Sequence, residues 1–253
     1  MSARFYCPDP PRDGRLRLSR DESRHLTRVC RLGLGDRVEV FDGRGFLATA
    51  EVVSVAGDSV ELALADEPPR PRRPPCSLTL ATAVPKGDRL DWLVEKATEL
   101  GVERLIPLVT DRSVVEPRDS KLSRLRRLII EASKQCRRDR LMILDDPVPW
   151  TRCIASCPGS VRLLADPDGD PPGRWPPIER GRSLALAVGP EGGFTTEERA
   201  RADQAGWQLI NLSVHTLRIE TACLAGCSAL LALCGGVTDT QGVALDTQGI
   251  ALG

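Results

Sequence analysis

A proline-rich segment divides this chain into two parts. Five of the ten residues 66–75 are proline. Proline fixes φ and lacks a backbone N–H, so neither a helix nor an interior strand can run through this segment. A chain of 253 residues can bury a separate small core on each side of it. We therefore expect one domain over residues 1–70 and a second over residues 74–237.

The end of the chain, residues 238–253, repeats a seven-residue sequence. Asp-Thr-Gln-Gly-Val-Ala-Leu at residues 239–245 is followed by Asp-Thr-Gln-Gly-Ile-Ala-Leu at residues 246–252. Two such copies are too few for a solenoid. We expect a terminal extension that carries no chemistry.

The first domain has the sequence pattern of a small β-barrel. Apolar and polar residues alternate along its last two strands, which the turn Ala-Gly-Asp separates. The spacing of Leu26, Val29 and Cys30 indicates a helix over residues 21–31. The expected strands cover residues 15–18, 37–41, 47–55 and 59–65.

The second domain alternates between strand and helix, which implies an α/β fold with a mostly parallel sheet. The expected strands cover residues 78–84, 105–109, 183–188 and 207–212, with shorter elements around 142–144, 151–156 and 162–165. The expected helices cover residues 89–100, 118–138, 195–205 and 218–234. Prolines and glycines indicate a loop over residues 167–177.

Composition argues against several classes of protein. The 35 basic and 35 acidic residues balance, so any site for a polyanion must be a local patch. Aromatic residues make up only 4%, too few for a surface that stacks single-stranded RNA bases. The nine cysteines lack C-x-x-C pairs, and only two histidines are present. We expect no metal site, no membrane span and no signal peptide, and hence a protein of the reducing cytoplasm.

The most informative motif follows an apolar strand. Gly-Pro-Glu-Gly-Gly-Phe at residues 189–194 is a glycine-rich turn, and Thr195 with Glu198 forms a capping box for the next helix. Glycines let a ligand approach the backbone at the carboxyl end of a parallel strand, where open α/β sheets bind ligands. The motif is neither a dinucleotide nor a triphosphate fingerprint. Taken alone, such a turn is as often structural as functional.

Two further stretches carry charged residues to the same expected edge. Arg218 and Glu220 stand near the start of the last helix, where free N–H groups favour anionic or carbonyl ligands. Lys86, Arg89 and Arg112 each follow a strand. Considered separately, each stretch reads more simply as a solvated helix start or helix surface.

These stretches together, and in this order, resemble the small-subunit ribosomal RNA methyltransferase E family of the SPOUT superfamily. The likeness covers residues 4–234, including a first domain similar to that family's PUA-like barrel. The shared sequences are Arg-Phe-Tyr at 4–6, Phe-Asp-Gly-Arg-Gly at 41–45, Pro-Lys-Gly-Asp-Arg at 85–89, Glu-Lys-Ala-Thr-Glu-Leu-Gly at 95–101, Arg-Ser-Val-Val at 112–115 and the 189–194 turn.

The resemblance implies a homodimeric enzyme with a trefoil-knotted α/β domain. It implies methylation of N3 of one uridine in 16S rRNA with S-adenosylmethionine. A bent adenosylmethionine needs close backbone approach and an apolar slot for adenine. The cofactor-binding residues carried over by position are Leu108, Thr110, Gly189, Pro190, Glu191, Gly192, Leu212, Ser213 and Leu217.

Three positions depart from the family pattern. Ser213 stands where the family usually has glycine, and His215 where it usually has arginine. Arg137 replaces another usual glycine. The first two alter the third expected cofactor loop, which bears on affinity or rate rather than on fold.

The chemistry assigns expected roles to three side chains. Uracil N3 carries a proton at neutral pH, so methyl transfer must remove that proton and stabilise an anion spread over O2 and O4. We expect Arg218 to stabilise the anion and Glu220 to accept the proton or to orient Arg218. Arg112 is the second candidate for the catalytic arginine.

The candidates for RNA binding are basic residues in three regions. Residues 118–140 hold nine basic and three acidic residues, which makes a phosphate-facing stripe about as plausible as a solvated helix. From this stretch we select Arg124, Arg127 and Arg138. The others are Arg4, Arg28 and Arg31 in the barrel, and Lys86 and Arg89 in the second domain.

Two other functions remain open at this stage. A non-catalytic RNA-binding or ribosome-assembly protein on the same fold is compatible with the altered residues Ser213 and His215. A SPOUT enzyme acting on transfer RNA is the third possibility. A measurement of S-adenosylmethionine binding distinguishes the non-catalytic protein from an enzyme. Methylation assays that compare purified small subunits with tRNA distinguish the rRNA enzyme from the transfer-RNA enzyme.

Overall fold

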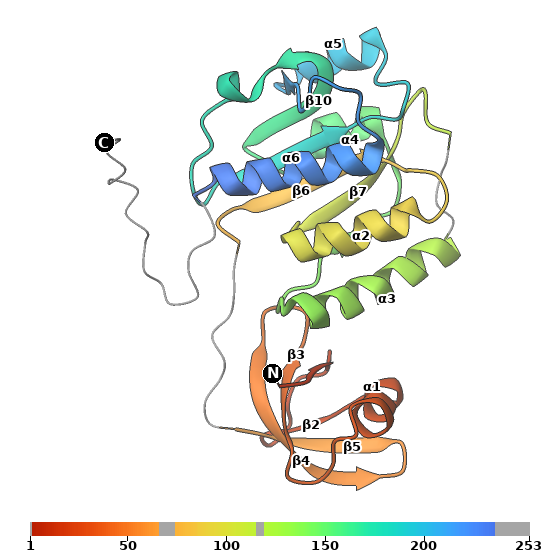
Figure 1. The fold of residues 1–253 in the computed structure, drawn as a ribbon, viewed down its shortest axis with the longest axis vertical. Helices are drawn as coiled ribbons and strands as arrows, with labels where there is room; N and C mark the ends of the chain where they lie inside the picture. The colour runs from red at the N-terminus through yellow and green to blue at the C-terminus, as the bar shows by residue number, and fades with distance from the viewer. Residues whose placement is uncertain (1, 66–73, 115–118, 236–253) are drawn as a thin grey trace, which may run out of the picture. The chain divides into compact units, whose positions relative to one another are not determined.

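The computed structural model describes residues 2–65, 74–114 and 119–235 (Figure 1). Its internal contacts divide the chain into two units. The first comprises Met1–Arg73 and Ser123–Met142, and the second Pro74–Leu122 and Ile143–Gly253. The expected terminal extension, most of the proline-rich segment and Arg118 lie outside the described residues.

A curled five-stranded sheet forms the first unit (Figure 1). Its order is β1-β3-β4-β5-β2, with β1 parallel to β3 and all other neighbours antiparallel. The predicted alternation is confirmed over the first part of β4, where Ala48, Ala50 and Val52 lie in the core. A register shift after Val52 bends this long strand. The strands are β1 (Arg4–Tyr6), β2 (Arg15–Arg17), β3 (Arg37–Phe41), β4 (Leu47–Ala56) and β5 (Ser59–Leu64).

The helix predicted over residues 21–31 is present but irregular. It consists of α1 (Arg20–Arg24) and then one π-helical turn, His25–Val29, closed by a hydrogen bond to a carbonyl five residues back. A π turn contains more residues than an α-helical turn. Leu26 is therefore buried as the spacing predicts, whereas Val29 is 67% exposed and does not belong to the core.

Helix α3 (Asp119–Cys136) runs into the first unit, which the sequence did not indicate. Nζ of Lys134 lies 2.8 Å from Oε1 of Glu22, and the two side chains are only 9% and 11% exposed. Arg137 pairs in the same way with Glu39 of β3. These partly buried pairs hold the end of α3 against α1 and β3.

A seven-stranded parallel sheet forms the centre of the second unit (Figure 1). Its order is β12-β10-β11-β6-β7-β8, and β9 also pairs with β7. All of these pairings are parallel, as the alternation of strand and helix predicts. The strands are β6 (Ser77–Ala83), β7 (Arg104–Val109), β8 (Ile143–Leu144), β9 (Val148–Pro149), β10 (Val161–Asp170), β11 (Ser183–Val188) and β12 (Gln208–Ile210).

Helices cover both faces of this sheet (Figure 1). On one face, α2 (Arg89–Leu100) packs against α6 (Ile219–Leu233), and α6 lies on β6 and β11. On the other face, α4 (Trp150–Ser156) and α5 (Thr196–Gln204) pack together over β7 and β12. Apolar residues on both sides of the strands explain why β6 and β11 are buried almost throughout.

Strand β10 continues where a loop was predicted. After an irregularity, Asp170 of β10 pairs with Ile210 of β12. A Cβ at Gly169 would lie 2.5 Å from the backbone of Ile210, so only glycine permits this close approach. The loop prediction is therefore wrong for residues 167–170. A short 3-10 turn, Pro172–Arg174, follows the strand.

Candidate active site

The predicted loops lie at one edge of the second unit because the sheet is parallel. Thr110 follows β7, residues 189–193 follow β11, and residues 211–218 follow β12. The carboxyl ends of parallel strands meet at the same edge, which is where open α/β sheets bind ligands. Leu108, Gly189 and Pro190 are buried there.

A buried carboxylate joins the first two of these loops. Glu198 of α5 is 4% exposed, and its two oxygens accept hydrogen bonds from the backbone N–H of Asp111 at 3.0 Å and of Thr195 at 2.8 Å. The N–H of Glu198 in turn donates to Oγ1 of Thr195, which completes the predicted capping box. The sequence indicated the cap but not the bond to Asp111, because nothing local marks a partner 87 residues away.

Arg112 makes the second connection between these loops. Its Nη1 donates to the carbonyl oxygen of Gly192. A Cβ at Gly192 would lie 3.2 Å from Cδ of Arg112, and a Cβ at Gly189 would lie 3.0 Å from the ring of Phe194. Glycine at these positions therefore allows the turn to sit against Arg112 on one side and the core on the other.

Helix α6 runs antiparallel to β6, and this direction positions the last group of candidate residues. Near its start, Sγ of Cys223 lies 3.1 Å from Oγ1 of Thr82 at the carboxyl end of β6. Just beyond its end, Sγ of Cys234 lies 2.7 Å from Sγ of Cys76, just before β6 begins. The first turn of α6 therefore lies at the same sheet edge as the glycine-rich turn.

Glu220 is the buried acid of this edge. It is 7% exposed, and its Oε1 lies 3.5 Å from Nη1 of Arg89, in the first turn of α2. Its Oε2 is buried and has no hydrogen-bond partner in the part of the chain that the structure describes. Arg218 occupies the N-cap position of α6 but does not cap it, and its side chain is exposed. A buried carboxylate oxygen and an exposed guanidinium thus flank the helix start.

Side-chain hydrogen bonds shape the third loop. The N–H of Ser213 donates to Oδ1 of Asn211 at 2.8 Å, and the N–H of His215 donates to Oγ of Ser213 at 3.1 Å. The hydroxyl of Ser213 therefore supports the turn where the family usually has glycine. Leu212 and Leu186 of β11 both lie against Gly226 of α6, which brings this loop beside β11.

Not every predicted RNA-binding residue is available at a surface. Arg4 is 7% exposed, and its guanidinium lies 4.6 Å from the ring centroid of Phe41. Burial lowers the pKa of Arg4 from its ordinary value. A guanidinium enclosed in this way cannot reach a phosphate at the surface, so we remove Arg4 from the proposed contacts. Arg89 is likewise directed to Glu220.

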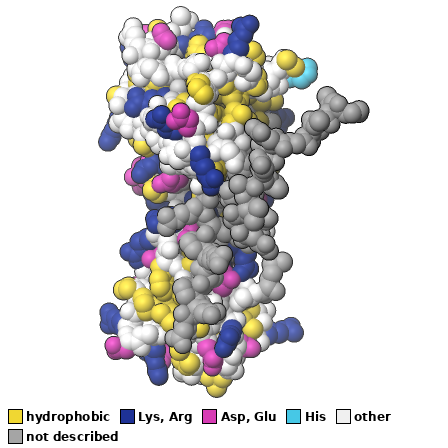
Figure 2. Space-filling model, turned by 90° about the vertical axis from the view of Figure 1, so that its left-hand side faces the viewer, with side chains coloured by type: hydrophobic (Ala, Val, Ile, Leu, Met, Phe, Trp, Pro, Cys, Tyr) yellow, Lys and Arg dark blue, Asp and Glu magenta, His cyan; other side chains and the backbone are white. Residues whose placement is uncertain are grey.

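The basic stretch around α3 is less free than its composition indicates. Lys121 pairs with Asp91, Lys134 with Glu22, and Arg137 with Glu39. The net charge of this stretch therefore does not face solvent as one stripe. Elsewhere on the protein, the face shown in Figure 2 carries basic side chains interleaved with acidic ones. Arg124 and Arg127 are exposed and stay candidates, while Arg138 is half-buried.

The cysteines are free, and seven of the nine are buried. Burial raises the pKa of Cys223 to about 12, and it also raises the pKa of Cys227. Within residues 2–65, 74–114 and 119–235, no cluster of three or more potential metal ligands occurs. No helix in the same ranges is long and apolar enough to cross a membrane.

Comparison with known proteins identifies the family. A family model described as an RNA methyltransferase domain matches residues 72–231, and one described as an RNA methyltransferase PUA domain matches residues 18–64. The ribosomal RNA small subunit methyltransferase E of a Synechocystis species is 30% identical over 233 residues, which covers 89% of this chain and 76% of the relative. The chain belongs to the ribosomal RNA small subunit methyltransferase E family.

Other members of the methyltransferase E family agree with this assignment. The Bacillus subtilis protein is 29% identical over 83% of this chain and 87% of its own length. A crystal structure of the Neisseria gonorrhoeae methyltransferase E bound to S-adenosyl methionine is 28% identical and has a TM-score of 0.84. That likeness covers 92% of this chain and 98% of the other. The two family models thus match a PUA domain followed along the chain by a methyltransferase domain.

The residues at the sheet edge are compatible with the cofactor found in the Neisseria structure. Glycine at 189 and 192 keeps the backbone of the turn free of side chains, and the half-buried Leu212 and Leu217 provide apolar surface, whereas Leu108 is fully buried behind the loop. Oε2 of Glu220 is an unpaired buried acceptor at the same edge. These residues can contact both the flat adenine ring and the polar groups of a ligand such as adenosylmethionine.

Proposed function

We propose that this methyltransferase transfers a methyl group from S-adenosylmethionine to N3 of one uridine in 16S rRNA of the small ribosomal subunit. The observation that carries the proposal is the direction of α6. It brings Arg218 and Glu220 to the sheet edge where the glycine-rich turn lies. The proposed cofactor site, the proton-accepting Glu220 and the anion-stabilising Arg218 thus share one edge of the sheet.

The cofactor loops are those predicted from the family resemblance. The backbone of residues 189–193 and the side chains of Leu212 and Leu217 would hold S-adenosylmethionine, which would supply an electrophilic methyl group when bound, and the buried Leu108 would support this site from the core. Glu198 and Arg112 keep two of the loops together through their bonds to Asp111 and Gly192. Thr110 is fixed by a bond from its N–H to Oγ of Ser113 at 2.8 Å.

The uridine must lose its N3 proton as the new N–C bond forms. In this proposal the buried Oε2 of Glu220, which has no hydrogen-bond partner among the described residues, accepts this proton, while Arg89 balances the charge on Oε1. The negative charge then spreads onto O2 and O4 of the base. The exposed guanidinium of Arg218 offers a planar pair of donors to these oxygens. Arg112 is engaged with Gly192 and is the second choice for this role.

RNA docking in this proposal uses exposed basic residues of both units. They are Arg28, Arg31, Lys86, Arg124 and Arg127, with the half-buried Arg138 as a further candidate.

The proposed assembly is a homodimer, with the trefoil knot and cytoplasmic location that the family resemblance implies. Helix α6 supports a dimer because it carries no charged residue after Glu220. Leu233 of α6 is 52% exposed and Trp92 of α2 is 47% exposed, so apolar surface remains uncovered in one chain. Light scattering on the purified protein tests this part separately.

Methylation of purified small subunits tests the function. Subunits from a strain that lacks the enzyme should gain one N3-methyluridine in 16S rRNA when incubated with the protein and labelled cofactor, as mapped by mass spectrometry. Label in tRNA instead would favour the transfer-RNA enzyme. A folded protein without measurable cofactor affinity in calorimetry would favour an RNA-binding assembly protein.

A further inference from the structure

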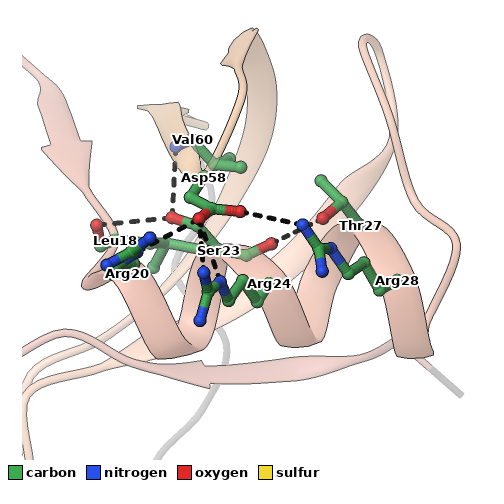
Figure 3. Close-up of polar contacts among 8 residues, drawn as sticks. All are labelled: Leu18, Arg20, Ser23, Arg24, Thr27, Arg28, Asp58 and Val60. Atoms are coloured by element: carbon green, nitrogen blue, oxygen red, sulfur yellow. Dashed lines mark hydrogen bonds and ion pairs between the residues drawn. The ribbon is translucent and has the colours of Figure 1, made fainter.

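One carboxylate in the first unit holds three arginines of the same helix (Figure 3). Oδ2 of Asp58 lies 3.1 Å from Nε of Arg20 and 2.8 Å from Nη2 of Arg24. Oδ1 of Asp58 lies 3.3 Å from Nη2 of Arg28. The three guanidinium groups therefore form a row along α1 and the π-helical turn, which we call the arginine row.

The π-helical turn explains why one carboxylate reaches all three. In a regular α-helix each step of four residues rotates a side chain by about 40° around the axis, so a row at i, i+4 and i+8 would spiral away. The step from Arg20 to Arg24 is α-helical, but the step to Arg28 crosses the wider turn. The wider turn rotates Arg28 back toward Arg20. This is the same local change that exposes Val29.

The position of Asp58 is fixed by a tight hairpin. Ala56 of β4 pairs with Ser59 of β5, which leaves a loop of two residues. Gly57 comes first with a φ of +61°, as in a type II′ turn. The helix is also attached to this hairpin, because Oγ of Ser23 accepts from the N–H of Val60 at 3.1 Å. The hairpin thus fixes the backbone of Asp58, and the hydrogen bond between Ser23 and Val60 fixes the helix that carries the arginine row.

The arginine row keeps an excess of positive charge and of free donors. Three guanidinium groups face one carboxylate, and each guanidinium has five N–H donors. The side chains of Arg20 and Arg28 are 70% and 71% exposed, and that of Arg24 is 41% exposed. Of the other acids on this helix, Glu22 is turned to Lys134, and Asp21 is exposed beside Arg24.

We propose that Asp58 is a positioning residue that aligns Arg20, Arg24 and Arg28 as one binding site for the phosphates of an RNA backbone. The proposal rests on the proposed function, because small-subunit rRNA is the ligand. Planar guanidinium groups bind phosphate with two parallel hydrogen bonds when they are held in place. Loose arginines would first have to lose side-chain entropy, and Asp58 has already fixed their direction.

Because Asp58 is negatively charged, a substitution can distinguish its effect on the alignment of the arginine row from its effect on net charge. Asp58→Asn removes one negative charge, which by itself would strengthen binding to a polyanion. If Asp58 acts by alignment, the same change must weaken it. Glu61→Gln is the matched control, because Glu61 of β5 also pairs with one exposed arginine, Arg17, at 2.6 Å.

The experiment measures binding of the full-length protein to 16S rRNA within small subunits over a series of salt concentrations. We expect Asp58→Asn to raise Kd about five- to tenfold and Glu61→Gln to leave it unchanged or lower it. The triple change of Arg20, Arg24 and Arg28 to Gln should make the salt slope shallower by about 2, as the loss of up to three phosphate contacts requires. Asp58→Glu should restore part of the affinity.

The readouts separate this inference from the proposed function. The single-turnover rate at saturating subunits should be normal in Asp58→Asn, with only the apparent KM for subunits raised. Equal or tighter binding by Asp58→Asn, with wild-type methylation intact, overturns the alignment role alone. Absence of methylation by the wild-type protein overturns the proposed function instead. Thermal unfolding of each variant verifies that it is folded.

Discussion

Nη1 of Arg89 lies 3.5 Å from Oε1 of Glu220, which joins the first turn of α2 to the first turn of α6. Glu220 is buried, whereas the side chain of Arg89 is 36% exposed. The pair therefore lies where a buried carboxylate meets the protein surface. The pair connects two of the three sequence stretches that resemble the family. It also leaves only one oxygen of Glu220 open to other groups.

A double-mutant cycle on this pair has an expected outcome. Arg89→Met should lower the free energy of unfolding by about 1 kcal/mol more than the double variant Arg89→Met, Glu220→Gln does. The single change leaves a buried carboxylate without its cation, whereas the double change removes both charges. Urea unfolding of the four proteins at pH 7 measures this. Strictly additive effects would show that the two side chains do not interact.

Arg218→Lys should slow methyl transfer about a hundredfold in single turnover, because loss of one donor to a developing anion costs on the order of 3 kcal/mol. A lysine cannot present a planar fork to two oxygens. The assay uses saturating cofactor and subunits, with RNA affinity measured in parallel. A variant that binds RNA weakly but reacts at the normal rate once saturated would move Arg218 to substrate docking, and Arg112 would be tested next.

Gly192→Val should abolish binding of S-adenosylmethionine while changing Tm little. A Cβ at Gly192 already meets Arg112 at 3.2 Å, so a branched side chain must displace Arg112 and fill the space beside the turn. Gly173→Val is the control, because nothing lies within 4 Å of a Cβ at that position. Unchanged cofactor affinity in calorimetry would remove this turn from the site.

Reversing Arg124 and Arg127 to Glu should flatten the salt dependence of RNA binding. Each lost phosphate contact reduces the log-log slope by about 0.7 to 0.9. Cofactor affinity should not change. An unaltered slope would mean that this exposed part of α3 is only a solvated surface.

The stability contributed by Asp58 should depend on pH at the acid end. Hydrogen bonds from Arg24 and Arg20 lower the pKa of Asp58 from 3.8 to about 2. Because the folded protein holds the carboxylate ionised, this contribution is complete above the ordinary pKa and is lost as the pH falls toward 2. The difference in Tm between the wild-type protein and Asp58→Asn should therefore be constant above about pH 5 and fade at lower pH. A difference that persists unchanged at pH 2 would argue against this assignment.

Local patterns were sufficient for most of the secondary structure. The helix Arg89–Leu100 and the strands Arg37–Phe41 and Ser183–Val188 have the predicted bounds. In each of these elements, the spacing of the apolar residues and the turn residues on either side predict the same bounds. The same holds for the capping box of Thr195 and Glu198, whose two hydrogen bonds close within four residues.

The sequence failed where a distant partner overrides the local pattern. Prolines and glycines indicated a loop at residues 167–170, yet pairing with β12 extends β10 through them. The basic patterns predict Arg4 and Lys134 at the surface, yet Arg4 packs against Phe41 and Lys134 pairs with Glu22. No spacing rule reports these neighbours, because burial depends on what the chain brings from elsewhere.

The sequence by itself determined the family and most of the secondary structure, because motifs and hydrophobic periods are local properties of the chain. Only the tertiary structure decided which charges meet. It directed Arg89 to Glu220 and aligned three arginines on Asp58, and it brought the backbone N–H of Asp111 to the carboxylate of Glu198. The physical reason is that ion pairs and hydrogen bonds act over a few ångströms in space, and only folding converts separations of 30 to 131 residues into such distances.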